Sequence, residues 1–291
     1  MRELSNGSDK QHGAGNFAML GSVASTAGEL LSYRDLVINL VARDLKVRYK
    51  NSALGFLWSL LNPLGMMIIF TIVFTIMMPN TTVEQFPVFV LCGLLPWNFF
   101  SGSVMSSVHS IVGNAPLLKR VYFPRQVLPL STVLSNLVNF LLAMLVLFAI
   151  IFLFGIPLTR WALLLPLIVL IQVTFTLGLA FFLCTLNVFY RDTAMIMDVV
   201  MLAWFFLTPV FYPINILPRY WVFHGFAFDV QRLAYILNPM ASLIASYRVI
   251  LYHGAPPGFD FLARTVVTSF GFLCLGYLFF TRHGKSFAEL L

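Results

Sequence analysis

Cationic side chains that could bind a cytosolic partner are concentrated in one short stretch of this sequence. The segment RDLKVRYKNSALGFLWSLLNP, residues 43–63, is basic at its start and almost wholly apolar afterwards. Such a cluster either fixes membrane topology by the positive-inside effect or offers a docking surface to a cytosolic protein. Four of its first eight residues are cationic: Arg43, Lys46, Arg48 and Lys50.

Helical periodicity over residues 34–50 predicts an amphipathic helix lying in the cytosolic membrane interface. Asp44 and Arg48 stand four residues apart and can pair. Gly55 allows a bend after this helix, and Pro63 should kink the first span. The predicted apolar face holds Ile38, Val41, Leu45 and Tyr49, and the predicted polar face holds Asn39, Arg43, Lys46 and Lys50.

A fragment of a nucleotide-binding motif occurs near the C-terminus. Gly284-Lys285-Ser286 matches the end of the G-x-x-x-x-G-K-[ST] loop, whose amides cradle phosphates. The motif requires its first glycine at position 279, but this residue is a phenylalanine inside an apolar run, and no strand precedes it. We therefore predict no cofactor in this chain, so that ATP and Mg²⁺ for any driven step are bound by a separate ATPase.

No constellation typical of an enzyme or a metal site is visible. The three cysteines lie in separate apolar runs without ligand spacing. The remaining titratable groups on the predicted outer side are equally scattered, which argues against a membrane-embedded enzyme. These groups are Glu84, Asp229, Asp260, His224 and His253.

Composition places the chain in a membrane. Hydrophobic residues make up 59% and charged residues 10% of 291 residues, and the mean hydropathy is +0.88. Soluble domains carry roughly 25% charged residues. We predict an all-α polytopic membrane protein, with a flexible cytosolic tail at 1–32 and a membrane domain at 33–291. Six apolar segments reach the length of about 20 residues that a bilayer requires, the fifth being short or tilted: 56–78, 87–111, 130–154, 162–186, 195–211 and 262–280.

The basic residues predict the orientation. With a cytosolic N-terminus, only five of the 18 Lys and Arg residues fall outside, so both termini should be cytosolic. Between spans five and six, residues 212–261 are too apolar for a solvated linker. This loop contains ASLIASYRVILY (241–252), which is too short to cross a bilayer, and we predict two re-entrant helices broken near Asn238-Pro239.

Several motifs in order resemble the permease subunits of ABC transporters that export polysaccharides or polyol phosphates, such as O-antigen, capsule and teichoic acid chains. The resemblance covers residues 30–291. It rests on the 43–63 stretch, LLPWNFFSGSV (94–104), LLKRVYFPRQVLPL (117–130), LNVFYRDT (186–193) and NPMASLIASYR (238–248).

The resemblance implies a homodimer of this permease driven by two copies of a cytosolic ABC ATPase in a bacterial cytoplasmic membrane. It also implies that the helix at 34–50 contacts the ATPase, that a coupling helix is centred on residues 117–125, and that the re-entrant helices gate the outer mouth. The implied ATPase-contacting residues are Arg43, Lys46, Lys50, Lys119, Arg120, Arg125, Arg191 and Asp192.

The implied cargo is a polyprenyl-linked glycan, which needs a lined, hydrated path because buried hydroxyls cost several kcal/mol each. Aromatic rings suit such a path, although they also serve as ordinary packing and interface residues. For Arg248 we favour snorkelling to the headgroups over binding a phosphate. The alternative cargo is a drug, lipid or antibiotic. The candidate path residues are Trp97, Phe99, Phe100, Trp204, Phe205, Tyr212 and Arg248.

Overall fold

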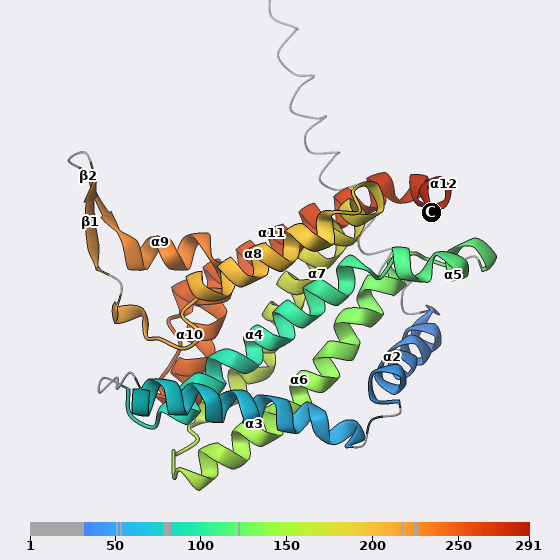
Figure 1. Ribbon diagram of the computed structural model, residues 1–291. Coiled ribbons are helices and arrows are strands. Elements are labelled where there is room, and N and C mark those ends of the chain that lie inside the picture. The colour runs from blue at the N-terminus through green and yellow to red at the C-terminus, as the bar shows by residue number, and fades with distance from the viewer. Residues whose placement is uncertain are drawn as a thin grey trace, which may run out of the picture.

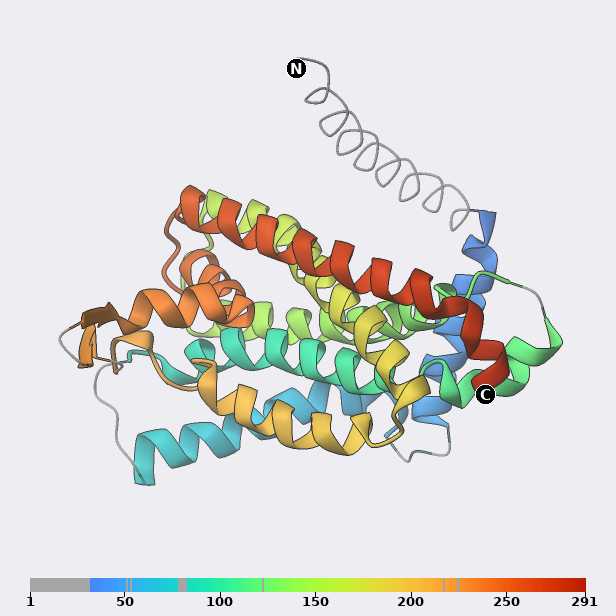
Figure 2. The ribbon, with the colours of Figure 1, turned by 90° about the horizontal axis from the view of Figure 1, so that it is seen from above.

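The computed structural model of the chain describes residues 32–50, 52, 54–77, 83–121, 123–216, 218–223 and 226–291. Long helices lie side by side in a bundle, as Figures 1 and 2 show. The predicted tail at 1–32 falls outside the described residues except for Ser32. The all-helical membrane fold predicted from composition is confirmed.

Five helices in the described part of the chain are long and apolar enough to cross a bilayer. The predicted fifth span corresponds instead to α8 (Thr193–Leu207), which has only 15 residues. Of the five, α3 (Trp58–Thr71) contains Pro63 and continues into π-helical turns at Ile72–Met77. The other four are α4 (Phe86–Val108), α6 (Val127–Leu153), α7 (Leu165–Phe189, preceded by a 3₁₀ turn at Arg160–Leu164) and α11 (Phe259–His283).

The predicted break in the loop after α8 is confirmed. Helices α9 (Val230–Leu237) and α10 (Pro239–Leu251) meet at an angle of 104°. Asn238 lies at the corner, and its Oδ1 accepts hydrogen bonds from the amides of Met240 and Ala241. An Asn before a Pro suits both a helix N-cap and a helix end, which explains the sharp turn.

The same loop holds an antiparallel hairpin that the sequence analysis did not predict. Strand β1 (Tyr220–Phe223) pairs with β2 (Phe226–Asp229), with Tyr220 opposite Asp229. Aromatic and β-branched residues in these short segments favour extended backbone. The hairpin leads directly into α9.

The elements are sorted between the two ends of the bundle. At one end lie α5 (Ala115–Arg120), the α7–α8 turn and α12 (Phe287–Leu290) (Figure 2). The hairpin and α9 lie at the opposite end. The loops that the sequence analysis assigned to the cytosol thus share one end of the bundle, and most of the loop between α8 and α11 lies at the other.

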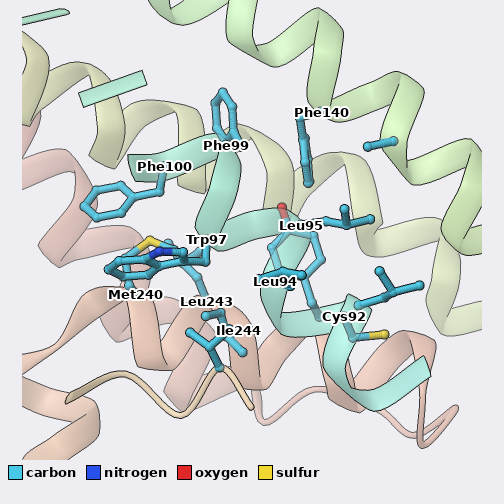
Figure 3. Packing of buried hydrophobic residues seen from close by; sticks show 14 of the residues in the cluster. Cys92, Leu94, Leu95, Trp97, Phe99, Phe100, Phe140, Met240, Leu243 and Ile244 are labelled. Carbon is cyan, nitrogen blue, oxygen red and sulfur yellow. The ribbon is translucent and has the colours of Figure 1, made fainter. Parts of the chain in front are cut away.

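Helix α4 is the centre of the core and is buried along most of its length. Its residues pack with Met240, Leu243 and Ile244 of α10 in one hydrophobic cluster (Figure 3). A polar chain also crosses this core. Tyr247 Oη donates to Gln172 Oε1 at 2.7 Å, and Gln172 Nε2 donates to the carbonyl oxygen of Pro96 at 2.7 Å. Both groups of the Gln172 carboxamide are thereby satisfied inside the bundle.

Candidate functional site: a polar cavity beside an interface helix

The predicted interface helix corresponds to α2 (Arg34–Tyr49), which packs against α6. Val37 and Leu40 are buried, whereas Ile38 is 61% exposed. The face that holds Ile38 and Tyr49 was predicted to lie in the headgroups. Ile38 is exposed, but Tyr49 bonds to Asn139 of α6, and the buried residues Val37 and Leu40 belong to another side of the helix.

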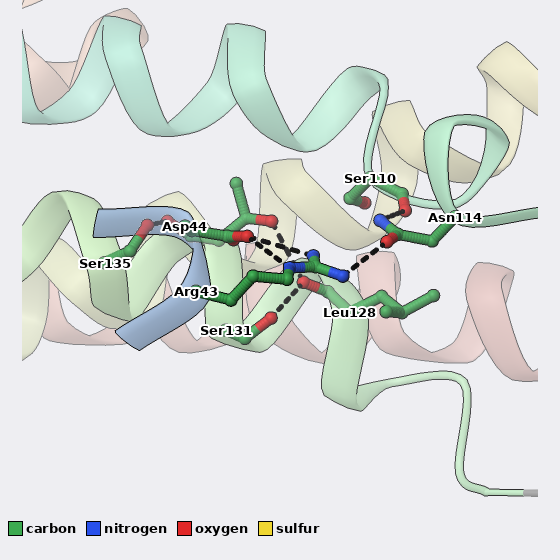
Figure 4. A network of polar contacts seen from close by, with 8 residues as sticks. Arg43, Asp44, Ser110, Asn114, Leu128, Ser131 and Ser135 are labelled. Atoms are coloured by element: carbon green, nitrogen blue, oxygen red, sulfur yellow. Dashed lines mark hydrogen bonds and ion pairs between the residues drawn. The ribbon is translucent and has the colours of Figure 1, made fainter. Parts of the chain in front are cut away.

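Arg43 ties α2 to the segment that precedes α5 (Figure 4). Its Nη1 donates to Asn114 Oδ1 at 3.1 Å, and its Nη2 lies 2.9 Å from Asp44 Oδ1. Asn114 in turn donates from Nδ2 to the carbonyl oxygen of Ser110 at 2.8 Å. The pairing of Asp44 with Arg48 that the spacing allows is not formed, because Arg43 holds the Asp44 carboxylate while Arg48 contacts α6.

The other residues with a predicted role in ATPase contact lie on α2 or at the α5 end of the bundle. Arg125 is half-buried, with its guanidinium 6.0 Å from the ring centre of Phe287. The remaining six are exposed and therefore free to meet a partner surface: Lys46, Lys50, Lys119, Arg120, Arg191 and Asp192.

A cavity of about 490 Å³ opens between α2, α3, α4 and α6. Two hydrogen bonds between α2 and α6 border it. Arg48 Nη2 donates to Asn136 Oδ1 at 3.0 Å, and Tyr49 Oη donates to Asn139 Oδ1 at 2.7 Å. Its further polar lining residues are Ser52, Ser59, Asn62, Asn98 and Ser106.

The cavity combines four carboxamides with aromatic rings. Asn62 and Asn98 line it without a side-chain hydrogen bond to another described residue. Phe99 stacks on Phe140 at 5.2 Å between ring centres, and both rings line the cavity beside Trp58. A carboxamide both donates and accepts hydrogen bonds, so this lining suits a ligand whose groups do the same. Polar residues among membrane helices are costly and mark functional sites.

The aromatic residues predicted to line a path separate into two groups. Of the predicted set, only Phe99 lines this cavity. The other rings pack together on another face of α4: Trp97 lies 5.5 Å from Phe205, and Phe100 lies 5.1 Å from Trp204. Trp97 and Phe100 are buried, so in the single chain they act as core packing.

Tyr212 and Arg248 lie together near the hairpin end. The prediction that Arg248 snorkels to headgroups is wrong, because its side chain is buried and only 6% of the residue is exposed. Its guanidinium stacks 3.6 Å from the ring centre of Phe89 and donates to the carbonyl oxygens of Pro209 and Val210. The Tyr212 carbonyl accepts a longer bond of 3.5 Å from the same group. The Arg248 guanidinium is thus satisfied by backbone carbonyl oxygens just after α8 and not by a carboxylate.

His253 follows α10 and faces the same region. Its ring meets that of Tyr252 edge-on at 4.7 Å. Partial burial lowers the pKa of His253, and the positive charge of Arg248 lowers it further. Among the described residues, no group of three His, Cys, Asp or Glu side chains is placed to hold a metal ion.

Residues 35–252 match the ABC-2 type transporter family. The chain belongs to this family. As an ABC-2 permease it is a multi-pass membrane protein, and membership implies an ATPase partner.

Relatives of this ABC-2 permease extend over nearly its whole length. The O-antigen export system permease protein RfbA of Myxococcus xanthus is 39% identical over 261 residues, covering 90% of this chain and 97% of the relative. A protein of the same name from Klebsiella pneumoniae is 32% identical over 260 residues, with 88% and 95% covered. The polysialic acid transport protein KpsM of Escherichia coli is 33% identical over 98 residues, which is 33% of this chain and 36% of that protein.

The asparagines of the cavity were missed at the sequence level. Each lies in an apolar segment, where it looks like an ordinary helix-to-helix hydrogen-bonding residue. The signal that could have found them is their number, because the segments that form α3, α4 and α6 all carry asparagine and all line the cavity.

Proposed function

We propose that this chain is the permease of an ABC exporter that moves a lipid-linked polysaccharide across the bacterial cytoplasmic membrane. The observation that carries the proposal is the match to O-antigen export permeases over 88–90% of the chain. The polar cavity adds physical support, since a sugar needs partners for its hydroxyl groups at membrane depth.

The lining of the cavity fits a sugar better than an apolar drug. Hydroxyl groups donate and accept, and the carboxamides of Asn62 and Asn98 offer both functions. The face of a ring such as Phe99 meets the C–H surface of a sugar without demanding one hydroxyl pattern. A chain of sugars can therefore bind and advance without a large desolvation penalty.

The proposed assembly is a homodimer with two copies of a cytosolic ABC ATPase. The cavity is lined from one side by α2, α3, α4 and α6, and a second copy would complete a path across the bilayer. Both termini lie in the cytosol in this proposal, which places α5 and the α7–α8 turn against the ATPase. Lys46, Lys50, Lys119 and Arg120 supply the basic surface for docking.

Deletion of the gene and complementation test the function directly. We expect the deletion strain to lose its surface polysaccharide and to accumulate lipid-linked glycan inside, and the wild-type chain to restore export. Surface polysaccharide that persists after deletion, together with altered drug or lipid tolerance, would contradict a glycan cargo.

Affinity purification in mild detergent tests the partner. The tagged wild-type chain should retain an ATPase, and the variant Lys46→Glu, Lys50→Glu, Lys119→Glu, Arg120→Glu should lose it. Arg160→Glu reverses one charge at the opposite end of the bundle and serves as the matched control. An ATPase that stays bound to the fourfold variant would remove this surface from the docking site.

A further inference from the structure

Three arginines meet at the hairpin end of the molecule. Arg219, Arg232 and Arg264 line one pocket of about 330 Å³. They come from three separate elements, namely the residue before β1, the first turn of α9 and the second turn of α11. The other lining residues are Asp229, Gln231, Tyr235 and Phe261.

The convergence is held by contacts between these elements. The amide of Val230 donates to the carbonyl oxygen of Arg219 at 3.1 Å, which ties the start of β1 to α9. Asp229 Oδ1 accepts the amide of Arg232 at 2.9 Å as the N-cap of α9. Packing of Tyr235 edge-on against Phe261, 5.1 Å between ring centres, joins α9 to α11.

Three arginines share a single carboxylate in this pocket, so its lining carries a net positive charge. Asp229 is the one acidic lining residue, and its Oδ1 already accepts the α9 backbone amide. Within the described residues, no ion pair joins any of the three arginines to a carboxylate. Arginines are disfavoured on the outer side of a bacterial membrane, yet three converge here. Three guanidinium groups around one carboxylate leave an excess of positive charge, which suits an external anion.

The adjoining helix places the pocket at a defined depth. Helix α9 exposes Leu233, Ile236 and Leu237 at 37%, 42% and 76%, and this spacing puts them on one face. Gln231, Arg232 and Tyr235 line the pocket on another face. A short helix with one exposed apolar face and a second face that carries Arg232 is suited to the interface plane, where lipid phosphates are found.

We propose that the pocket formed by Arg219, Arg232 and Arg264 binds the phosphate group of a lipid in the outer leaflet. Each planar guanidinium can pair with two phosphate oxygens, and Phe261 and Tyr235 form an apolar wall beside them. The phosphate belongs to a resident anionic phospholipid or to the polyprenyl carrier of an exported chain. The proposal rests on the orientation given under the proposed function and is independent of the cargo.

Native mass spectrometry of the purified full-length chain tests the proposal. Phosphatidylglycerol and polyprenyl phosphate are titrated separately onto delipidated protein, with polyprenol as the probe that lacks phosphate. The variant Arg219→Gln, Arg232→Gln, Arg264→Gln should bind phosphate-bearing lipid about tenfold more weakly than wild type. Arg160→Gln is the control, since Arg160 stacks on Trp161 and does not line the pocket.

The two lipid arms identify the source of the phosphate. If the triple Gln variant loses binding of both phosphate-bearing lipids, the pocket binds any lipid phosphate. If the variant loses binding of polyprenyl phosphate alone, the pocket binds the carrier. Arg264→Lys, which keeps the charge, should retain part of the binding, and an unchanged Tm shows that the variants are folded. Equal affinity of wild type and the triple Gln variant, or equal binding of polyprenol, would overturn the proposal. Because export is not measured, a negative result here leaves the proposed function to its own test.

Discussion

Arg43 on α2 donates a hydrogen bond to Asn114 at the start of α5, 71 positions away in sequence, with 3.1 Å between Nη1 and Oδ1. The interface helix and the predicted coupling helix are therefore linked directly. A displacement of α5 by a bound ATPase would reach α2 through this contact. Helix α2 borders the polar cavity through Arg48 and Tyr49, so the link joins the proposed docking surface to the candidate path.

Asn114→Ala should weaken coupling and leave docking intact. Removal of the carboxamide breaks the bond to Arg43 and the bond to Ser110, each contributing about 0.5–1.5 kcal/mol. We expect the ATPase to co-purify in normal amount while the polysaccharide exported per ATP hydrolysed falls a few-fold. Asn39→Ala, at an exposed position of α2, is the control. Unchanged export per ATP would show that the link transmits nothing.

The packing of α7 against α11 depends on two glycines in contact. A Cβ built on Gly276 would overlap the carbonyl group of Gly178, so even alanine forces the helices apart. We expect Gly276→Ala to lower the free energy of unfolding by about 1–3 kcal/mol, the cost typical of overpacking. The loss of stability is measured as a lower apparent Tm by fluorescence-detected size-exclusion chromatography after heating. Gly271→Ala lies on the same helix with open space around it and should leave Tm unchanged. Equal Tm for the two variants would refute this account.

Hydropathy and helix-breaking residues were enough to predict much of the architecture. Runs of apolar residues locate α3, α4, α6, α7 and α11, because a bilayer demands such runs. The corner at Asn238 follows from an Asn-Pro pair inside an apolar loop. The β1–β2 hairpin was not predicted because its strands have only four residues each and resemble interfacial aromatic segments.

The polar contacts could not be predicted in the same way. Local spacing allowed a pair between Asp44 and Arg48. In the folded chain, Arg48 donates a hydrogen bond to Asn136 on α6, and Asp44 accepts one from Arg43. Burial of Arg248 likewise depends on carbonyl oxygens that only the folded end of α8 presents. Such partners are brought together by tertiary packing, which a single sequence does not display.

Arg248 should be a stability residue. Arg248→Met leaves the carbonyl groups of Pro209 and Val210 without their buried donors, at about 1–3 kcal/mol for each. The variant should show a lower Tm in detergent and earlier proteolysis near the end of α8. Arg248→Lys should recover only part of the loss, since an ammonium group cannot reproduce the planar set of donors. Arg160→Gln provides the comparison, and an Arg248→Met protein as stable as that control would contradict the role.

The cavity makes the sharpest prediction about transport. Asn98→Leu keeps the branched shape of the side chain and removes a carboxamide that has no bond to another described residue, and the larger methyl groups can extend into the cavity, so stability should change little. A sugar bound there would lose a donor and an acceptor together, and we expect export to fall about tenfold, with Tm and ATPase binding unchanged. Thr174→Val alters an exposed polar residue of α7 away from the cavity, and export should stay normal. Should Asn98→Leu export polysaccharide at the wild-type rate, the path would run elsewhere, with the dimer contact as the next region to test.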